Sequence, residues 1–586
     1  MLTETADALE LRSKRSERSA YAGAAWYIIG IALVAIALMV PSEQYSLSLS
    51  GGSKDLSWGP YLFRALLVFH GVMLIFLATG SLQWLTRSSS VANEKEAINP
   101  TTVVALIALS ALALILRLWN LNSAPWIDEV LTLVDFVRLP INEIVITFPS
   151  QNQHMLYSVL ARGAFAIFGE GTGALRLPAV MFGIGSIWAL FFFARSVTGT
   201  REALLACGLM TVSYHHVWFS QNGRGYTGLL MMTLLATWAW IEAIRQDRWK
   251  WWALYIAAIV AGMWIHMTMA FVVASHGLVY ALFLVSPKLS GDVGETALER
   301  RAGVKPLVAW LLSVTVTLQL YALSLPEFIR TGLHEESRGS EWTNPIWVLT
   351  ESIQNLSIGF GGLAVVSVAA AFVGLGWISI FRRDRRAALL MVLPPFLSGG
   401  LMLVLGHNLF PRFFFFAMGF GILIVIHGAF ETSHLILRPF GRRVQMPRLA
   451  ARVGVVSAIF MIAVSLATVP RNYALPKQDF AAARDYVESQ LATGSTAVAV
   501  NLAGDMFAKY YAPNWTTTRD ASELDLLERE NDQVWLVYTM PFEIQAFSPD
   551  LWKSIQNDFE IVRIFPGTLN GGEVVVCRSR GYQVKK

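Results

Sequence analysis

Charge is scarce in this sequence. Of its 586 residues, 15% are charged and 54% are hydrophobic, and the mean hydropathy of +0.49 is far more apolar than a soluble domain needs for its core. A soluble globular protein is therefore excluded, and a membrane protein is predicted. The net charge of +5 gives no reason to expect nucleic-acid binding, because cytoplasmic loops of membrane proteins carry an excess of Lys and Arg.

Several other features are missing or rare. The two cysteines, Cys207 and Cys577, lie far apart, which excludes a disulfide framework and a thiolate metal cluster. A phosphate-binding loop of the Walker A type is absent. The basic segment 1–22 precedes an apolar run at 23–40 as in a signal peptide, yet no small-residue cleavage site follows this run. We therefore expect an uncleaved first helix.

Long apolar runs are what the sequence has instead. A helix that crosses a bilayer needs about 20 predominantly apolar residues. By the hydropathy rule about thirteen spans are expected, which places the two termini on opposite sides of the membrane. The expected spans are 23–40, 61–85, 101–119, 174–195, 203–219, 225–243, 251–266, 268–286, 305–325, 359–381, 387–405, 412–434 and 452–470.

Basic loops set the expected orientation. On this topology the N-terminus shares one side with clusters of Lys and Arg at residues 245–250, 300–305, 381–386 and 438–448. The positive-inside rule makes this side cytoplasmic. The loops 120–173 and 326–358 and everything after residue 471 are then extracytoplasmic.

Three parts are expected along the chain: residues 1–100 with a cytoplasmic N-terminus and two additional helices, residues 101–470 as the membrane domain, and residues 471–586 as a soluble tail. The tail contains runs of strand length, "TAVAVNL", "QVWLVYT" and "GGEVVVCRS", and one amphipathic helix pattern, "DFAAARDYVESQL". A small α/β domain outside the membrane is therefore predicted. The apolar segment 155–169 is too short to cross a bilayer and fits an interfacial or re-entrant helix.

Polar residues gather at the outer ends of the expected spans. A charged side chain at membrane depth costs about 2.5–3.5 kcal/mol even on lenient insertion scales, so each such residue suggests a function. This gathering is the main evidence in the sequence for a site. The residues are Asp128, Glu129, His154, Arg176, Arg224, His266 and Arg412.

An acid pair stands in "SAPWIDEVLTL", shortly after the third expected span. Adjacent helical side chains point about 100° apart, so at most one of Asp128 and Glu129 can face a ligand squarely. Partial burial beside a Trp and aliphatic residues would raise a carboxylate pKa and suit it to general-base chemistry. The alternative is that the pair caps or solvates an interfacial helix.

Two arginines and two histidines are the candidate partners of a phosphate. Arg224 lies between two glycines that allow close approach, and its fork of donors suits phosphate; Arg412 stands between a Pro and an aromatic run. For both, the alternative is snorkelling to headgroup phosphates. His154 and His266 could donate to phosphate, transfer protons or bind a metal, but a lone His is more often structural, and no spacing supports a dedicated zinc site. Arg176 begins a span and is expected to anchor it.

The order of these features resembles a known family. "WIDE" is followed by "QHMLYSVLARGAFAIFGEGTGALRLPAVMFGIGS", "SQNGRGYTGLLMMTLL", "WIHMTMA" and "LFPRFFFFAMG", and then by the α/β tail. Over roughly residues 100–470 this is similar to the bacterial family 39-like, or aminoarabinose-transferase-like, integral membrane glycosyltransferases of the GT-C superfamily. In relatives the segment around His154 often reads His-Pro-Pro-Leu-Tyr, whereas Met155 and Leu156 follow it here.

The resemblance implies a polytopic helical protein with the GT-C fold and an α/β tail. It implies an enzyme of cell-envelope glycan biosynthesis in the bacterial cytoplasmic (inner) membrane. The enzyme would move a sugar from a polyprenyl-phosphate-linked donor to a lipid, glycan or protein acceptor on the outer face. Direct displacement with one base predicts inversion of the anomeric configuration.

The resemblance also assigns roles. Asp128 would be the general base, and Glu129 would orient the acceptor or, in some relatives, a metal. No cofactor is firmly expected, and a divalent metal stays open. The donor phosphate would be held by Arg224, Arg412 and His154, and other substrate contacts are expected at His266, Tyr226 and Gln221.

Two other classes of function remain. A polyprenyl-linked lipid transporter or flippase would also use charge in the membrane, but the charges gather at one face rather than the midplane and no inverted repeat is visible. A non-catalytic envelope scaffold would bind other proteins through the outer tail. Within the same superfamily, transfer of an oligosaccharide from a pyrophosphate lipid is a further alternative, although the tail lacks the expected acceptor-reading motif.

Overall fold

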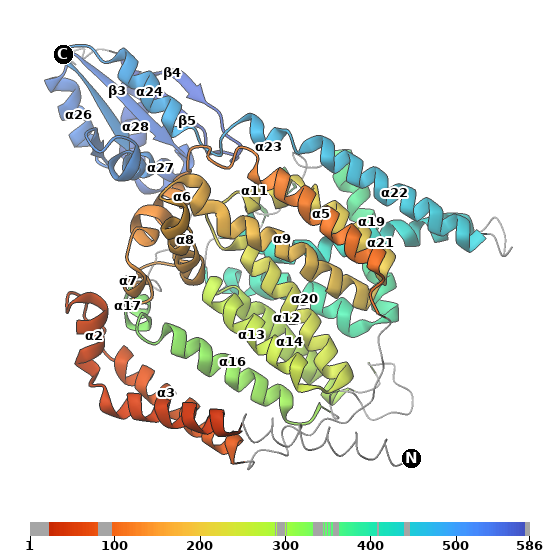
Figure 1. Ribbon diagram of the computed structural model, residues 1–586. Helices are drawn as coiled ribbons and strands as arrows, with labels where there is room; N and C mark the ends of the chain where they lie inside the picture. The colour runs from red at the N-terminus through yellow and green to blue at the C-terminus, as the bar shows by residue number, and fades with distance from the viewer. Residues whose placement is uncertain are drawn as a thin grey trace, which may run out of the picture.

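The computed structural model describes residues 23–79, 97–286, 302–331, 362–406, 409–438 and 446–580, with a few single positions between them. A body of packed helices carries a smaller domain with a sheet at one end (Figure 1). The basic segment 1–22, most of the cluster 438–448 and most of the loop 326–358 lie outside the described residues.

The helical body confirms a multi-pass membrane protein. Among the described residues, 8 helices are long and apolar enough to cross a membrane, or up to 9 if the bent pair Gly23–Met39 and Ser42–Ser50 is one span. The number of thirteen spans stays a prediction. The long apolar helices are α3 (Gly59–Ala78), α5 (Pro100–Leu118), α9 (Thr172–Val197), α12 (Tyr226–Gln246), α19 (Leu363–Arg383), α20 (Arg385–Val404), α21 (Met418–Leu437), which follows the 3-10 turn η5 (Pro411–Ala417), and α22 (Met446–Thr468).

Shorter helices complete the body. The segment expected to be interfacial or re-entrant forms the 14-residue helix α8. Its length is below that of a span, in line with the expectation, although no membrane position follows from it. The shorter helices are α8 (Met155–Phe168), α13 (Trp249–Ile265), α14 (Met269–Val285) and α16 (Lys305–Tyr321).

The single span expected at 203–219 is wrong. The segment forms two helices, α10 (Thr200–Thr211) and α11 (Tyr214–Ser220), and α11 is too short to cross a membrane. The side chain of Ser213 accepts a backbone N–H of α11 and so caps its start. Buried Arg117 of α5 donates to the last carbonyl of α10 at 3.2 Å, which satisfies a backbone group that the break leaves free.

The tail forms a five-stranded sheet in the order β2-β1-β3-β5-β4, covered by helices, which confirms the predicted α/β fold. Strand β1 runs parallel to β2 and β3, whereas β5 runs antiparallel to β3 and β4. The sequence predicted β1, β3, β5 and the helix α24 (Phe480–Gln490), but not β2 or β4. The strands are β1 (Ser495–Val500), β2 (Thr516–Thr518), β3 (Gln533–Thr539), β4 (Phe559–Phe565) and β5 (Val574–Ser579).

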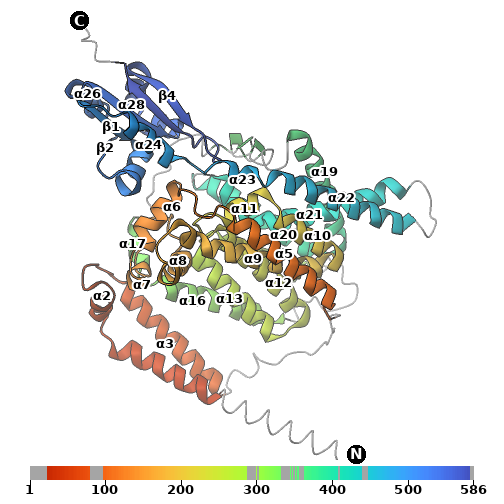
Figure 2. The same cartoon turned by 45° about the horizontal axis from the view of Figure 1, so that its top comes forward.

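The sheet domain rests on the short helix α6 (Ile127–Thr132), as both views show (Figures 1 and 2). Gln478 accepts the backbone N–H of Ile127 at 3.3 Å and donates to Thr539 in the sheet at 3.2 Å. Tyr511 donates to the Pro125 carbonyl just before α6. The tail therefore holds the segment that carries the acid pair.

Candidate active site

Helix α6 turns the two acids in different directions. Its first turn contains both, and the Glu129 side chain accepts the backbone N–H of Trp126 at 3.3 Å, which closes a capping box at the start of the helix. This bond draws Glu129 back toward the N-terminus of α6. Asp128, one position earlier, lines a large cavity. The expectation that only one neighbour faces a ligand agrees with this arrangement.

Both carboxylate oxygens of Glu129 accept hydrogen bonds from within the protein. Arg176 of α9 donates to its two oxygens at 2.7 and 2.6 Å, and the backbone N–H of Gly223 donates at 2.6 Å. Burial raises the pKa of Glu129, but the charges of Arg176 and Lys477 and these hydrogen bonds lower it more, so the pKa lies below its usual value. The geometry favours a positioning role, because no acceptor contact is left for either oxygen.

Asp128 faces Arg412 across the wall of the cavity. Oδ2 of Asp128 lies 3.5 Å from a terminal nitrogen of Arg412, and the two side chains are 11% and 28% exposed, so the pair is reachable from the cavity. Asp128 Oδ2 and Arg412 Nε have no hydrogen-bond partner in the described part of the chain. The Arg412 guanidinium lies over Phe410 at 4.4 Å. An acid and a cation are therefore both available to a substrate.

Arg224 and His154 place two donors side by side. Arg224 donates to the Asn152 carbonyl at 2.9 Å, and its second terminal nitrogen lies 3.1 Å from His154 Nε2. The N–H of Gly225 donates to His154 Nδ1 at 2.8 Å, so in a neutral ring Nε2 carries the proton. Burial and the charges of Arg224, His266 and Arg412 hold the pKa of His154 well below its usual value. A neutral donor beside a guanidinium suits an anion that contacts both groups.

His266 and Tyr226 join this cluster. The ring of His154 lies 4.7 Å from that of His266 and 5.4 Å from that of Tyr226, and Arg224 lies 5.8 Å from the Tyr226 ring. The Tyr226 hydroxyl is buried with no partner among the described residues. Four of the predicted residues are thus together, but they are not among the side chains that line the cavity, whose wall includes Arg412.

The side chain of Gln221, for which a substrate contact was expected, forms hydrogen bonds within the protein instead. Its amide donates to the carbonyls of Arg117 and Trp119 at 3.0 and 2.6 Å, and its oxygen accepts from Asn472 at 2.8 Å. These bonds tie the end of α5 to the start of the tail. A substrate contact at Gln221 finds no support in this geometry, because its hydrogen-bonding groups are already used.

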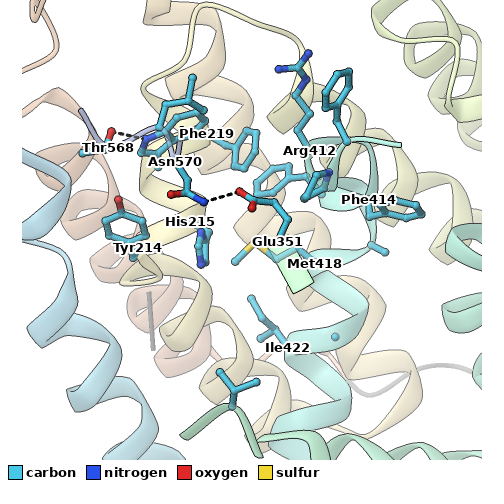
Figure 3. Close-up of a pocket in the computed structure, with 18 of the residues that line it drawn as sticks. Tyr214, His215, Phe219, Glu351, Arg412, Phe414, Met418, Ile422, Thr568 and Asn570 are labelled. Carbon is cyan, nitrogen blue, oxygen red and sulfur yellow. Dashed lines mark hydrogen bonds between the residues drawn. The ribbon is translucent and has the colours of Figure 1, made fainter. Parts of the chain in front are cut away.

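A cavity of about 1680 Å³ lies between the helical body and the tail. Its wall combines residues of α6, α11, η5, α19, α21 and α22 with the segment 568–573 of the tail. Figure 3 shows aromatic and aliphatic side chains along this wall and a polar link among them, where Asn570 donates to Glu351 at 2.9 Å. An elongated apolar ligand with a polar head fits such a wall.

Comparisons with known proteins identify the fold. Residues 153–291 match the family of dolichyl-phosphate-mannose-protein mannosyltransferases, and this match includes His154, Arg224, Tyr226 and His266. No curated protein matches the chain. The oligosaccharyltransferase of Archaeoglobus fulgidus with zinc and sulfate shares the fold at a TM-score of 0.51 and 11% identity, over 78% of this chain and 71% of that one. The chain has the GT-C fold.

Two further structures are similar. AglB of Archaeoglobus fulgidus, in complex with an inhibitory peptide and a dolichol-phosphate, has a TM-score of 0.50 and 12% identity over 81% of this chain and 74% of its own. ArnT of Cupriavidus metallidurans in the apo state has a TM-score of 0.47 and 14% identity. The alignment covers 81% of this chain and 98% of ArnT. The two Archaeoglobus fulgidus structures show the shared fold, and the family model matches one part of the chain.

A divalent metal fits the acid pair Asp128 and Glu129 poorly. Glu129 is saturated by Arg176 and backbone N–H groups, and Asp128 already faces the Arg412 cation. Metal ions of this kind prefer several free carboxylate or carbonyl oxygens. Within the described ranges, the acidic side chains that come close enough to hold an ion are Asp525, Glu528 and Asp558 of the tail. The guanidinium groups of Arg176 and Arg412 supply positive charge beside this pair.

Lys477 is a site neighbour that the sequence did not indicate. Its ammonium donates to the Gln221 carbonyl at 2.6 Å and lies 5.1 Å from the Trp218 ring. Burial and the charge of Arg176 lower the pKa of Lys477, the charge of Glu129 raises it, and together they bring the pKa to about 7. A lysine shortly after the last span looks like an ordinary interfacial residue, so only its partners reveal its position.

Proposed function

We propose that the protein is a membrane glycosyltransferase that moves a sugar from a polyprenyl-phosphate-linked donor to an acceptor hydroxyl. The reaction takes place on the side of the membrane that carries the tail, which is the outer face of a bacterial cytoplasmic membrane. The observation that carries this proposal is the Asp128–Arg412 pair in the wall of a large apolar cavity. The Arg224–His154 donors supply further positive charge and a proton-bearing nitrogen.

Asp128 acts as the general base. As the acceptor oxygen attacks the anomeric carbon, its proton passes to the free oxygen of Asp128, and the bond between the anomeric carbon and the phosphate oxygen breaks. One base and direct displacement invert the anomeric configuration. Glu129 does not take the proton, because Arg176 and Gly223 occupy its oxygens.

The cations stabilise the leaving group. The departing polyprenyl phosphate gains negative charge in the transition state, and donors that are already in place stabilise this charge without reorganisation. Arg412 and Arg224 present charged donors, and His154 presents Nε2–H beside Arg224. The Nε atoms of these two arginines are buried and have no hydrogen-bond partner among the described residues.

The apolar part of the cavity receives the lipid. A polyprenyl chain needs a groove of apolar side chains beside the charged site, and residues of α19, α21 and α22 supply one. The family description names dolichyl-phosphate mannose as the donor of the matched family, and AglB was solved with dolichol-phosphate. Both ligands belong to the chemical class proposed for this chain.

The test uses purified full-length protein in lipid nanodiscs. A panel of undecaprenyl-phosphate-linked sugars is offered with lipid, glycan and peptide acceptor fractions, and release of undecaprenyl phosphate is measured together with the glycosylated product. Transfer from at least one donor, lost in Asp128→Asn, is expected. Lipid movement across the bilayer without any transfer would instead identify a transporter, and the proposal would be wrong.

The orientation has its own test. A reporter that is active only in the cytoplasm is fused after residue 586. We expect no signal, because the basic loops place the tail outside. A strong signal would reverse the proposed side of the reaction.

A further inference from the structure

Asn222 offers an amide donor that the protein itself leaves unused. Its side chain is fully buried, at 0% exposure, and it lines the cavity. Its oxygen accepts a hydrogen bond from Trp126 Nε1 at 3.2 Å. Tryptophan Nε1 can only donate, so the amide oxygen must face Trp126 and the NH₂ group must point elsewhere. That Nδ2 has no partner in the described part of the chain.

A buried donor without a partner is rare, because most buried polar atoms form a hydrogen bond within the protein or with ordered water. Asn222 is also held firmly. The preceding Gln221 is bound by three hydrogen bonds, and the N–H of the following Gly223 is bound to Glu129. The amide therefore stays in place to meet a ligand, at little cost in ordering.

The surroundings indicate what kind of ligand this is. Asn222 lines the cavity together with Asp128 and with the rings of Trp126 and Trp218, whose centres are 5.9 Å apart. Aromatic faces pack against the apolar C–H face of a sugar ring, and an amide N–H is a good donor to a hydroxyl oxygen. Both groups lie on the wall that also carries the proposed base.

We propose that Nδ2 of Asn222 donates a hydrogen bond to a hydroxyl of a sugar bound beside Asp128. This inference rests on the proposed function and adds a residue that selects the sugar. The hydroxyl belongs either to the transferred sugar or to a sugar of the acceptor. In both cases a sugar that lacks this hydroxyl leaves Nδ2 buried and unpaired, which is how such a site rejects the analogue.

The test combines variants with monodeoxy analogues. Wild-type protein, Asn222→Ala and Trp126→Phe are assayed with the undecaprenyl-phosphate sugar that the wild-type protein uses, with its monodeoxy analogues, and with monodeoxy analogues of a sugar acceptor. For the natural substrates Asn222→Ala should lower kcat/KM about tenfold, the size of one hydrogen bond. For one analogue the wild-type protein should lose the same factor, and Asn222→Ala should lose nothing further.

The analogue that shows this behaviour identifies the source of the hydroxyl, as a donor or an acceptor analogue. Trp126→Phe keeps an aromatic face but removes the bond that holds the Asn222 oxygen. The NH₂ group is then no longer fixed, so the discrimination between analogues should weaken. Thermal unfolding is followed in parallel, and Asn222→Ser replaces Asn222→Ala if the latter does not fold.

The outcomes are distinct. If Asn222→Ala lowers kcat/KM equally for every analogue, or has no effect, the inference is wrong while the proposed function stands. If the wild-type protein transfers no sugar from any donor, the proposed function fails and this inference fails with it.

Discussion

Two neighbouring acids each face an arginine, and the two pairs differ in distance, exposure and saturation. The Glu129–Arg176 pair is separated by 2.6 Å, and its side chains are 0% and 1% exposed. The Asp128–Arg412 pair is separated by 3.5 Å, and its side chains are 11% and 28% exposed. All oxygens of the first pair are bonded, whereas the second leaves Asp128 Oδ2 and Arg412 Nε without a hydrogen bond in the described residues.

The difference indicates that the two neighbouring acids, Asp128 and Glu129, have different roles. A closed, buried pair is costly to break, because either partner alone would be an uncompensated buried charge. The longer and more exposed Asp128–Arg412 pair is expected to contribute less to stability. Glu129 and Arg176 thus help to fix the position of α6, and this position places Asp128 beside Arg412 in the cavity wall.

The largest expected effect is on turnover. Asp128→Asn keeps the shape of the side chain and removes its basicity, so single-turnover transfer at saturating donor should fall about 10²–10⁴-fold. Thermal unfolding should stay close to wild type. A variant that transfers at full rate would show that the Asp128–Arg412 pair does not contain the base.

A change in the Glu129–Arg176 pair should affect stability more than turnover. Arg176→Ala leaves Glu129 charged and buried, and this should lower the free energy of unfolding by about 3–5 kcal/mol. Arg412→Ala is the matched control and should lower stability by less, because its ion pair is longer and its side chains are more exposed. Denaturation of both variants in the same detergent measures the contrast. Equal losses of stability would remove the distinction between the pairs.

Donor affinity should change next in size. Arg412→Ala and Arg224→Ala each remove charged donors from the proposed phosphate, which should weaken binding of undecaprenyl phosphate by about 1.5–3 kcal/mol. Equilibrium binding of undecaprenyl phosphate in nanodiscs measures this. If both variants bind as wild type does, the phosphate lies elsewhere.

The smallest effect concerns Lys477 beside the closed pair. Its pKa is lowered to about 7, so between about pH 7 and its unfolded value the unfolded chain binds a proton that the folded protein does not. Stability therefore rises with pH over this range, by at most about 1.4 kcal/mol per unit, and below pH 7 the contribution is constant. Lys477→Met should remove this rise, seen in unfolding midpoints at pH 7, 8 and 9. If the unfolding midpoints of Lys477→Met and wild-type protein changed equally with pH, this prediction would be wrong.

Much of the fold could be predicted because apolar length and β-branched runs are local signals. The segment 203–219 misled for the same reason: its hydropathy is continuous, and the break depends on a cap at Ser213 and on Arg117, which comes from another helix. Strand β2 has only three residues and lies beside β1, so its pairing rather than its own sequence defines it.

The candidate site could be predicted as a set of residues but not as a division of tasks. Arg224, His154, His266 and Tyr226, to which the resemblance assigned substrate contacts, lie close together, and their roles stay predictions. Which neighbour of the acid pair faces the cavity depends on Arg176 and Gly223, which are distant in sequence.

The contact between the tail and α6 also sets an order of events during biosynthesis. Gln478, which holds the backbone of Ile127, follows it by 351 positions, so Asp128 is synthesised long before the residues that support its helix. A chain that stops before the tail lacks the support of α6 by Gln478 and Tyr511. The support of α6 is therefore complete only after the tail has been synthesised.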